Sequence, residues 1–549
     1  MSDQYEVISS LANQENDFTF KRKYNMRIPD TNSGSYPSSQ INFNLSSLTT
    51  NNAFLSCKQS SLEIPYVVRV TSTVALGTAA QNTYMVALKK SVADLVNGIS
   101  VQLNENSIIN FADLSNLATQ FKILSTWSEA DVLVKGDIIN WAKNNASAYG
   151  YNDGAGSIEG VGEYNNTLLT PAVEFTPASG LELGLGSVPN VGMRKRAQKT
   201  SYNAVQTELA KFSNTTHAQN AHKAYYDQVS TTSIFYYMMV TVPLTCLHDL
   251  FEKLPLIRNP YFKMTIQVHT ATAVIPYTHA GTLMGLTSVS SSFNYNPIMV
   301  SKATNGFTGT ADAVITIKSG IASVDSSSAI YGGHTCYFNA CLYEFNPDAE
   351  AKYIDAVGNK LVRYQDVYSN RLVNSTGAIN WQIHTGIAKI RGLLIVTNLG
   401  SGVNCLATPA TAVGAGTSVL LSPFTSGENM LGCSFTNMNI KIGGVPHYQE
   451  NINYSYDIFK NEVMSYNSVN GGLSNGVCSG LISQNDFESG VFAYTFVDLS
   501  RKPRSEDDLP KTIHFCATNN SLASALDLTA FVFYENNLSI NVDTSQISL

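Results

Sequence analysis

The sequence predicts an all-β protein, and three observations support this fold class. Short runs of β-branched and aromatic residues recur along the chain, for example at 234–242 and 526–534. Turn signals separate these runs at intervals of about 8–12 residues, as is typical of sandwiches and barrels. Helical periodicity is confined to a few short segments, such as 111–127.

The chain is predicted to form two barrels in succession. Its 549 residues exceed what one hydrophobic core supports, because cores stop growing beyond roughly 250–300 residues. Eight-stranded jelly rolls bury such strands and protect their edges, and two of them, with short helices and long inserted loops, would use the whole length. We therefore predict a polar arm at 1–38, a first jelly roll at 39–272 with a loop insertion at about 128–227, and a second jelly roll at 273–549.

The stretch 230–269 is predicted to be central to the first jelly roll. An apolar strand at 234–242 ends at Pro243, and 261–268 alternates as a second strand. Between them, apolar residues at three- and four-residue steps share one face of a short helix: Leu244, Leu247, Leu250, Phe251 and Leu254. We interpret this unit as architectural and as the close of the first domain.

A second cycle of elements begins near Val274 and repeats the order of the first. The strand at 438–442, the turn at 443–444 and the helix at 454–466 correspond to the strand at 99–103, its polar turn and the helix at 111–127. The strands at 492–499 and 512–517 correspond to the two strands of the central stretch. The recurring order of element types indicates a duplication.

The composition limits the classes of partner. Charged residues make up 14% of the chain, against about 25% in typical domains, which favours a surface that ends up against other protein. The net charge of −7 excludes the chain as a whole from binding nucleic acid, because such binding depends on cationic side chains. Two basic clusters, 21–23 and 194–196, are interpreted as ordinary solvated or loop charges.

The eight cysteines are scattered and form no CxxC pair, so the sequence predicts reduced thiols and assembly in the cytosol or nucleus. The polar start MSDQYEVISS lacks the apolar core of a signal peptide. No stretch approaches the length of about 18 apolar residues that a transmembrane helix needs.

We predict no catalytic residue, no cofactor and no metal site. The chain has no GxSxG, HExxH or GxxxxGK[ST] motif. His248–Asp249 would be half of a catalytic triad in a functional interpretation, but surface or capping polarity on the short helix is preferred. His217 and His222 are spaced poorly for metal binding. Asp507–Asp508 would offer oxygen ligands to Ca²⁺, but a solvated loop is preferred.

Three segments carry a resemblance to a known family. They are CLHDLFEKLPLIRNPYFKMTI (246–266), FKNEVMSYNSVNGGLSNGVCSGLISQNDFES (459–489), and the ending FAYTFVDLSRKP (492–503) with LDLTAFVFYENNLSINVDT (526–544). In this order the segments resemble double jelly-roll major capsid proteins, in particular those of polinton-like viruses and virophages. The spacer RKPRSEDD (501–508) departs from the pattern, since the first half has a helix there.

The resemblance implies a structural capsid protein rather than an enzyme. In that family a homotrimer presents six jelly rolls as a pseudo-hexagonal capsomer, and capsomers tile an icosahedral shell around a DNA genome. Neighbouring capsomers, penton and minor capsid proteins and an internal membrane are the implied partners, without specific nucleic-acid binding. The polar arm would reach such a partner, and the insertion at 128–227 would form the outer tower. The implied location is the virion, after assembly in the host cytoplasm or nucleus.

Two other classes of protein remain open at this point. A monomeric or fibrous β-sandwich that binds carbohydrate, such as a lectin or adhesin, would have a signal peptide, exposed aromatic platforms and calcium-binding acidic loops. A β-rich polysaccharide hydrolase would need paired carboxylates in a cleft, and nothing in the sequence marks such a pair.

Overall fold

The structure is a computed structural model of the chain. It describes residues 19–49, 52–74, 84–144, 192, 196, 225–230, 232–278, 283–284, 288–302, 313–321, 335–383, 386–399, 420–421, 423, 434–466, 480–488, 492–500, 507–521 and 525–548. The predicted insertion at 128–227 lies mostly outside the described residues.

The first jelly roll is built from strands that lie far apart in the sequence. Its eight strands are β1 (Phe20–Pro29), β2 (Gln40–Asn44), β3 (Phe54–Ser72), β5 (Val96–Leu103), β6 (Asn106–Ile109), β8 (Ser233–Pro243), β10 (Phe262–Val268) and β16 (Tyr337–Phe345). One sheet has the order β1-β16-β3-β8 and the other the order β2-β10-β5-β6. The first strand thus pairs with the eighth and the second with the seventh, which is the jelly-roll arrangement.

The second jelly roll repeats this order. Its eight strands are β17 (Asn359–Thr376), β18 (Ala378–Ile383), β19 (Ile390–Leu399), β20 (Phe435–Ile442), β21 (Val445–Pro446), β22 (Thr495–Asp498), β23 (Ile513–Asn519) and β24 (Ala525–Asn541). The sheets run β17-β24-β19-β22 and β18-β23-β20-β21. The duplication and the double jelly roll expected from the sequence are therefore present in the strand order of the chain itself.

Additional strands extend the sheets. β15 (Ala313–Ile321) pairs with β3, and β11 (Ala271–Thr278) pairs with β15. The other strands are β4 (Tyr84–Leu88), β7 (Tyr225–Ser230), β9 (Ile257–Arg258), β12 (Leu283–Met284), β13 (Ser288–Ser291), β14 (Ile298–Lys302) and β25 (Ile547–Ser548).

Two of the predicted domain limits are wrong. Part of the predicted arm, 20–29, forms β1 and pairs antiparallel with β16. β16 itself, expected in the second jelly roll, completes the first by pairing with β1 and β3. The central stretch therefore does not close the first jelly roll. We propose that the boundary lies in α9 (Pro347–Val357), between β16 and β17.

The helices expected from apolar periodicity are confirmed. The prediction at 111–127 corresponds to α2 (Ser115–Thr126), and that at 454–466 corresponds to α10 (Tyr456–Ser465). The central stretch contains η8 (Leu244–Cys246) and α8 (Leu250–Lys253) between β8 and β10. The remaining helical segments are α3 (Glu129–Lys135), α11 (Gln484–Glu488), η1 (Pro37–Ser39), η2 (Ser46–Leu48) and η4 (Val92–Leu95).

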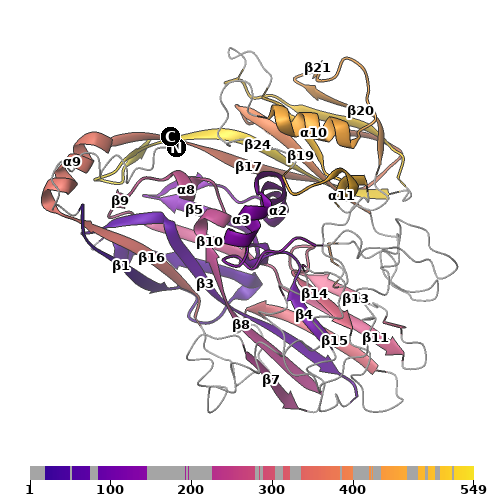
Figure 1. Cartoon of the computed structure of the whole chain (residues 1–549), viewed down its shortest axis with the longest axis horizontal. Coiled ribbons are helices and arrows are strands. Elements are labelled where there is room, and N and C mark those ends of the chain that lie inside the picture. Colours follow the sequence, from indigo (N-terminus) through magenta and orange to yellow (C-terminus); the bar gives the residue numbers. More distant parts are fainter. Residues whose placement is uncertain are drawn as a thin grey trace.

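A main hydrophobic core runs through both jelly rolls, and a smaller cluster lies under α9. Alternating residues of β10 (Phe262, Met264, Ile266 and Val268) are buried, as expected for a strand with one face on a core. Figure 1 shows α2, α3 and α8 between the strands of the first jelly roll and the long strands β17 and β24 of the second. These helices form the first unit's part of the contact between the two jelly rolls.

Candidate functional site at the seam between the jelly rolls

The two jelly rolls meet along a seam, which we define as α2 and α8 of the first unit with β17, β22 and β24 of the second. Phe121 on α2 stacks on Phe496 of β22, with ring centroids 5.3 Å apart. The Tyr364 hydroxyl on β17 donates a hydrogen bond to the carbonyl of Ile108 at 2.8 Å. Aromatic packing and hydrogen bonds thus join units whose strands belong to separate sheets.

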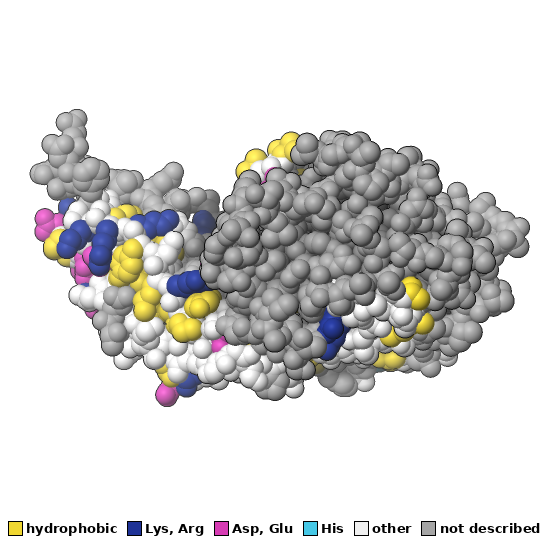
Figure 2. Space-filling model, turned by 90° about the horizontal axis from the view of Figure 1, so that it is seen from below, with side chains coloured by type: hydrophobic (Ala, Val, Ile, Leu, Met, Phe, Trp, Pro, Cys, Tyr) yellow, Lys and Arg dark blue, Asp and Glu magenta, His cyan; other side chains and the backbone are white. Residues whose placement is uncertain are grey.

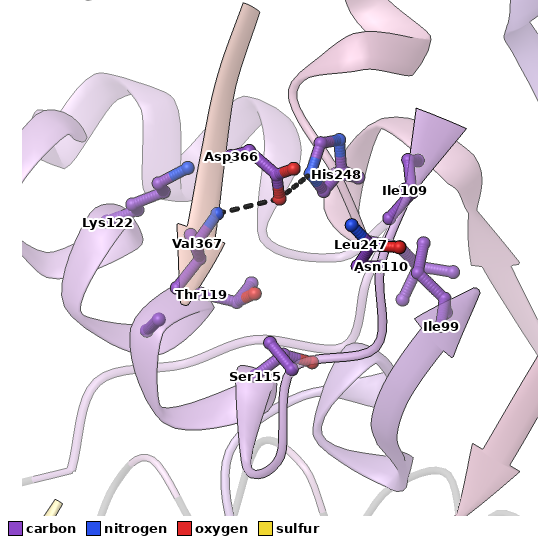
Figure 3. Close-up of a pocket in the computed structure, with 12 residues that line it drawn as sticks. Ile99, Ile109, Asn110, Ser115, Thr119, Lys122, Leu247, His248, Asp366 and Val367 are labelled. Atoms are coloured by element: carbon purple, nitrogen blue, oxygen red, sulfur yellow. Dashed lines mark hydrogen bonds and ion pairs between the residues drawn. The ribbon is translucent and has the colours of Figure 1, made fainter. Parts of the chain in front are cut away.

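An imidazole and a carboxylate form the polar centre of the seam (Figure 3). Nε2 of His248 lies 3.2 Å from Oδ1 of Asp366, a residue of β17. The backbone N–H of Leu250 donates to Nδ1 of His248 at 3.2 Å. Since Nδ1 accepts this bond, Nε2 carries the proton and donates to Asp366.

The Asp366 carboxylate has two further donors. The backbone N–H of Val367 donates to Oδ1 at 2.8 Å, and the Tyr534 hydroxyl donates to Oδ2 at 2.7 Å. Burial, reinforced by the charge of Asp366, raises the pKa of Tyr534 well above its usual value, so this hydroxyl stays protonated. The buried carboxylate is therefore fully paired, as a buried charge has to be.

Asp249 supports the seam separately from His248. Its Oδ2 accepts from the backbone N–H of Gln365 at 2.9 Å and lies 2.7 Å from Nζ of Lys253. Burial alone would raise the pKa of Asp249, but the charges of Lys122 and Lys253 and these hydrogen bonds lower it below its ordinary value. Burial in turn lowers the pKa of Lys122, which faces the same region.

Two hollows adjoin these residues. A cavity of about 40 Å³ lies between Ser115, Lys122, His248 and Asp366, and Figure 3 shows their side chains around it. Beside it a groove of about 620 Å³ runs along the seam, with aromatic walls and charged rims. The smaller cavity has room for a water molecule but not for a substrate.

The geometry of His248 contradicts the triad interpretation of His248–Asp249. Its carboxylate partner is Asp366 rather than Asp249, and both ring nitrogens are already hydrogen-bonded. A general base needs a free ring nitrogen directed at a hydroxyl or thiol. Part of the expected capping interaction is present, since Nδ1 of His248 accepts a hydrogen bond from the first backbone N–H of α8. The arrangement fastens two units together.

The acidic pair at 507–508 is engaged in ion pairs. Both carboxylate oxygens of Asp507 lie 2.7 Å from the guanidinium of Arg391, and Asp508 lies 3.5 Å from Nζ of Lys389. The solvated-loop expectation thus holds for the exposed Asp508 but is wrong for Asp507. His217 and His222 lie outside the described residues, and the described part contains no cluster of three or more metal-binding side chains.

The two basic clusters occupy different environments. Lys21, Arg22 and Lys23 are exposed on β1, in agreement with solvated charges. Arg196 is fully buried and donates to the carbonyls of Leu88 and Ala142, so the expectation of an ordinary loop charge is wrong for it. Arg194 and Lys195 lie outside the described residues.

The sequence interpretation missed Asp366, Tyr534 and Arg391. Asp366 lies in a strand, 359–376, in which polar and apolar residues alternate, and it occupies a buried position. An acidic residue at a buried position of such a strand indicates that its charge is paired with another group. Its partners come from segments 118 and 168 residues away, so their identity depends on the tertiary fold.

Comparisons with known proteins found similarity to solved structures of viral capsid proteins. No family model matches the chain, and no curated protein is significantly similar to it in sequence. The major capsid protein of mavirus is 9% identical, with a TM-score of 0.43, over 95% of this chain and 89% of its own. The Faustovirus major capsid protein has the same identity and TM-score, over 96% and 91%. A quasi-atomic model of the PBCV-1 virus capsid is 9% identical, with a TM-score of 0.40, over 98% and 99%.

The chain is thus similar to viral major capsid proteins, the class that its sequence motifs resemble, along nearly its whole length. The double jelly roll itself is defined by the strand order of the chain. None of the helices in the described ranges is long and apolar enough to cross a membrane.

Proposed function

We propose that this chain is the major capsid protein of an icosahedral DNA virus and that it acts as a homotrimeric capsomer. The observation that carries the proposal is the repetition of one jelly-roll order in two adjacent units of a single chain. A trimer of such chains presents six similar barrels, and six barrels around a three-fold axis form a block with a hexagonal outline. Such blocks tile a closed surface.

The surface composition supports an assembling protein. Only 14% of the chain is charged. In the described part, large apolar side chains are strongly exposed on α3 and its flank, where Leu133 is 78% exposed and Ile138 is 64% exposed. Clustered apolar side chains on a surface mark interaction sites. Neighbouring chains and capsomers would cover them.

The further partners follow from this role. The capsomer would contact neighbouring capsomers, penton and minor capsid proteins and an internal membrane, without specific binding of nucleic acid. The protein would act in the virion after assembly in the host cytoplasm or nucleus. The residues before β1 would reach such a partner, and the segment 128–227 would contribute to the outer tower of the capsomer.

Electron microscopy of the purified protein tests the proposal. Negative-stain class averages should show particles with a hexagonal outline and three-fold symmetry. Small asymmetric particles the size of one chain, combined with binding on a glycan array, would favour the carbohydrate-binding alternative and contradict a capsomer.

A further inference from the structure

The groove along the seam has the size and the walls of a binding site. Its volume of about 620 Å³ falls within the range of about 300–1,000 Å³ that is usual for ligand sites. Aromatic and aliphatic side chains of both units line it: Phe121, Trp127, Ile139, Leu247, Phe496 and Phe533. Apolar grooves of this kind accept the apolar face of an amphipathic segment.

Most of the charged side chains that line the groove are already paired. Nζ of Lys135 lies 2.8 Å from Asp131, and Nζ of Lys253 lies 2.7 Å from Asp249. Two cations and one carboxylate of the lining remain outside these pairs: Lys58, Lys122 and Glu252. Because the charge of Lys122 also interacts with Asp366, the cation that a partner would meet first is Lys58 at the rim.

The rim of the groove lies close to the start of β1. Residues 57–60 of β3 bulge out of the pairing with β16, and Lys58 lies in this bulge. The neighbouring Gln59 accepts a hydrogen bond from the hydroxyl of Tyr343 at 2.7 Å. The ring centre of Tyr343 in turn lies 4.7 Å from that of Phe20, the first residue of β1. Two strand spacings, about 10 Å, therefore separate β1 from the strand that carries the rim.

The start of β1 is basic. Arg22 pairs with Glu344, whereas Lys21 and Lys23 have no ion-pair partner in the described part of the chain. Nζ of Lys23 lies 5.5 Å from the ring centre of Tyr343, on the way to the rim. Figure 2 shows Lys and Arg side chains gathered at the end of the molecule where Figure 1 places β1 and β16. A segment that runs from β1 to the groove would pass along these cations.

Residues 1–18, which precede the described part, have the composition that this path favours. Tyr5, Ile8 and Leu11 recur at three-residue steps, the spacing of one face of a helix. The segment has no lysine or arginine and four carboxylates: Asp3, Glu6, Glu15 and Asp17. When extended, a chain of this length spans up to about 60 Å, which is more than the rim requires.

We propose that residues 1–18 dock in the seam groove of their own chain. Tyr5, Ile8 and Leu11 would contact its aromatic walls, and the carboxylates would lie along Lys58 and the start of β1. Because both units line the groove, the docked segment would join the two jelly rolls in the free chain. A partner in the shell would then engage the segment by drawing it out of the groove. The inference concerns a single chain and does not depend on the proposed trimer.

Photochemical cross-linking in the full-length protein tests the docking. Tyr5→p-benzoylphenylalanine should cross-link on irradiation to residues 119–139 or 243–253, as identified by mass spectrometry. Ser10→p-benzoylphenylalanine is the matched control and should cross-link there much less, since Ser10 lies opposite the apolar face. Mixing with ¹⁵N-labelled chains separates links within a chain from links between chains. Cross-links confined to other surfaces, or formed only between chains, would overturn the inference.

A peptide of residues 1–18 gives a second measurement. In fluorescence anisotropy it should bind the chain that lacks residues 1–18 at least tenfold more tightly than the full-length chain, whose own segment occupies the groove at high effective concentration. In the shortened chain, Lys58→Glu should weaken binding about fivefold, the effect of one charge at the rim. Lys263→Glu, at an exposed lysine on another sheet, should leave binding unchanged.

Circular dichroism melting establishes that the shortened chain and its variants are folded. Equal affinity of the peptide for the full-length and shortened chains, or binding to neither, would contradict the docking and leave the proposed function intact. Light scattering of the same full-length protein reports on the trimer separately, so a monomeric chain whose cross-links lie in the groove would support this inference and overturn the proposed function.

Discussion

His269 lies in a buried polar cluster of the first jelly roll and has no exposed surface. Its Nε2 lies 3.3 Å from Oδ1 of Asn116, whose Nδ2 donates to Asp94. Nε2 therefore carries the proton, and Nδ1 is an unprotonated atom without a hydrogen-bond partner. Burial, together with the charges of Lys89 and Lys90, lowers the pKa of His269 to about 3. The folded protein thus keeps this imidazole neutral well below neutral pH.

His269→Gln should flatten the dependence of stability on pH. The unfolded chain takes up this proton near pH 6.5 and the folded chain only near pH 3, so the wild type loses stability as the pH falls through this window. Between pH 7 and pH 5 the loss from this group is about 2 kcal/mol, at about 1.4 kcal/mol per pKa unit. Urea denaturation at the two pH values measures it. An equal loss in both proteins would show that another group is responsible.

Arg391 holds two carboxylates at the edge of the second jelly roll. Its guanidinium lies 2.7 Å from Asp507 and 2.9 Å from Glu535. Arg391→Met should lower the free energy of unfolding by about 3–5 kcal/mol, because two largely buried carboxylates would lose the guanidinium that lies between them. Arg22→Met is the control, since that side chain is 61% exposed and surface pairs contribute little. Similar urea midpoints for the two variants would contradict this role.

At the scale of elements, α2 is the helix that couples the two units. Phe121, 3% exposed, packs on Tyr494 and Phe496 across the seam. Phe121→Ala should cost about 3–5 kcal/mol, the usual range for a buried phenylalanine, and should separate unfolding into two transitions. Phe111→Ala, at a position 41% exposed, should cost much less. Calorimetry distinguishes the outcomes, and one unchanged transition for Phe121→Ala would mean that the seam does not depend on α2.

The helices and strands differ in how well the sequence pattern predicts them. Apolar residues at three- and four-residue steps located α2 and α10 because local periodicity survives in the folded chain. β1 was missed because exposed Lys21, Lys23 and Arg27 obscure the alternation of Tyr24, Met26 and Ile28. The place of β16 depends on pairing with β1, which lies about 300 residues away, and no local pattern encodes such pairing.

The candidate site was predictable only in part. The His248–Asp249 pair drew attention to the correct segment, since both side chains lie at the seam. The carboxylate that His248 binds, Asp366, is 118 residues further along the chain. Sequence analysis can associate residues that are adjacent in the chain. The contact between His248 and Asp366 forms only after the two jelly rolls have packed against each other, so the sequence does not reveal it.

At the scale of the whole molecule, duplication explains both the seam and the assembly that we propose. Two units with the same strand order meet through unlike sides, since α2 and α8 of the first unit contact β22 and β17 of the second. The low fraction of charged residues agrees with a surface that other chains cover.

The mass of the purified chain in solution tests this most directly. Light scattering after size exclusion, at micromolar concentration, should give three times the chain mass of 59.5 kDa. A stable trimer of that mass is the result we predict. A clean species of one chain mass over the same concentration range would contradict the capsomer.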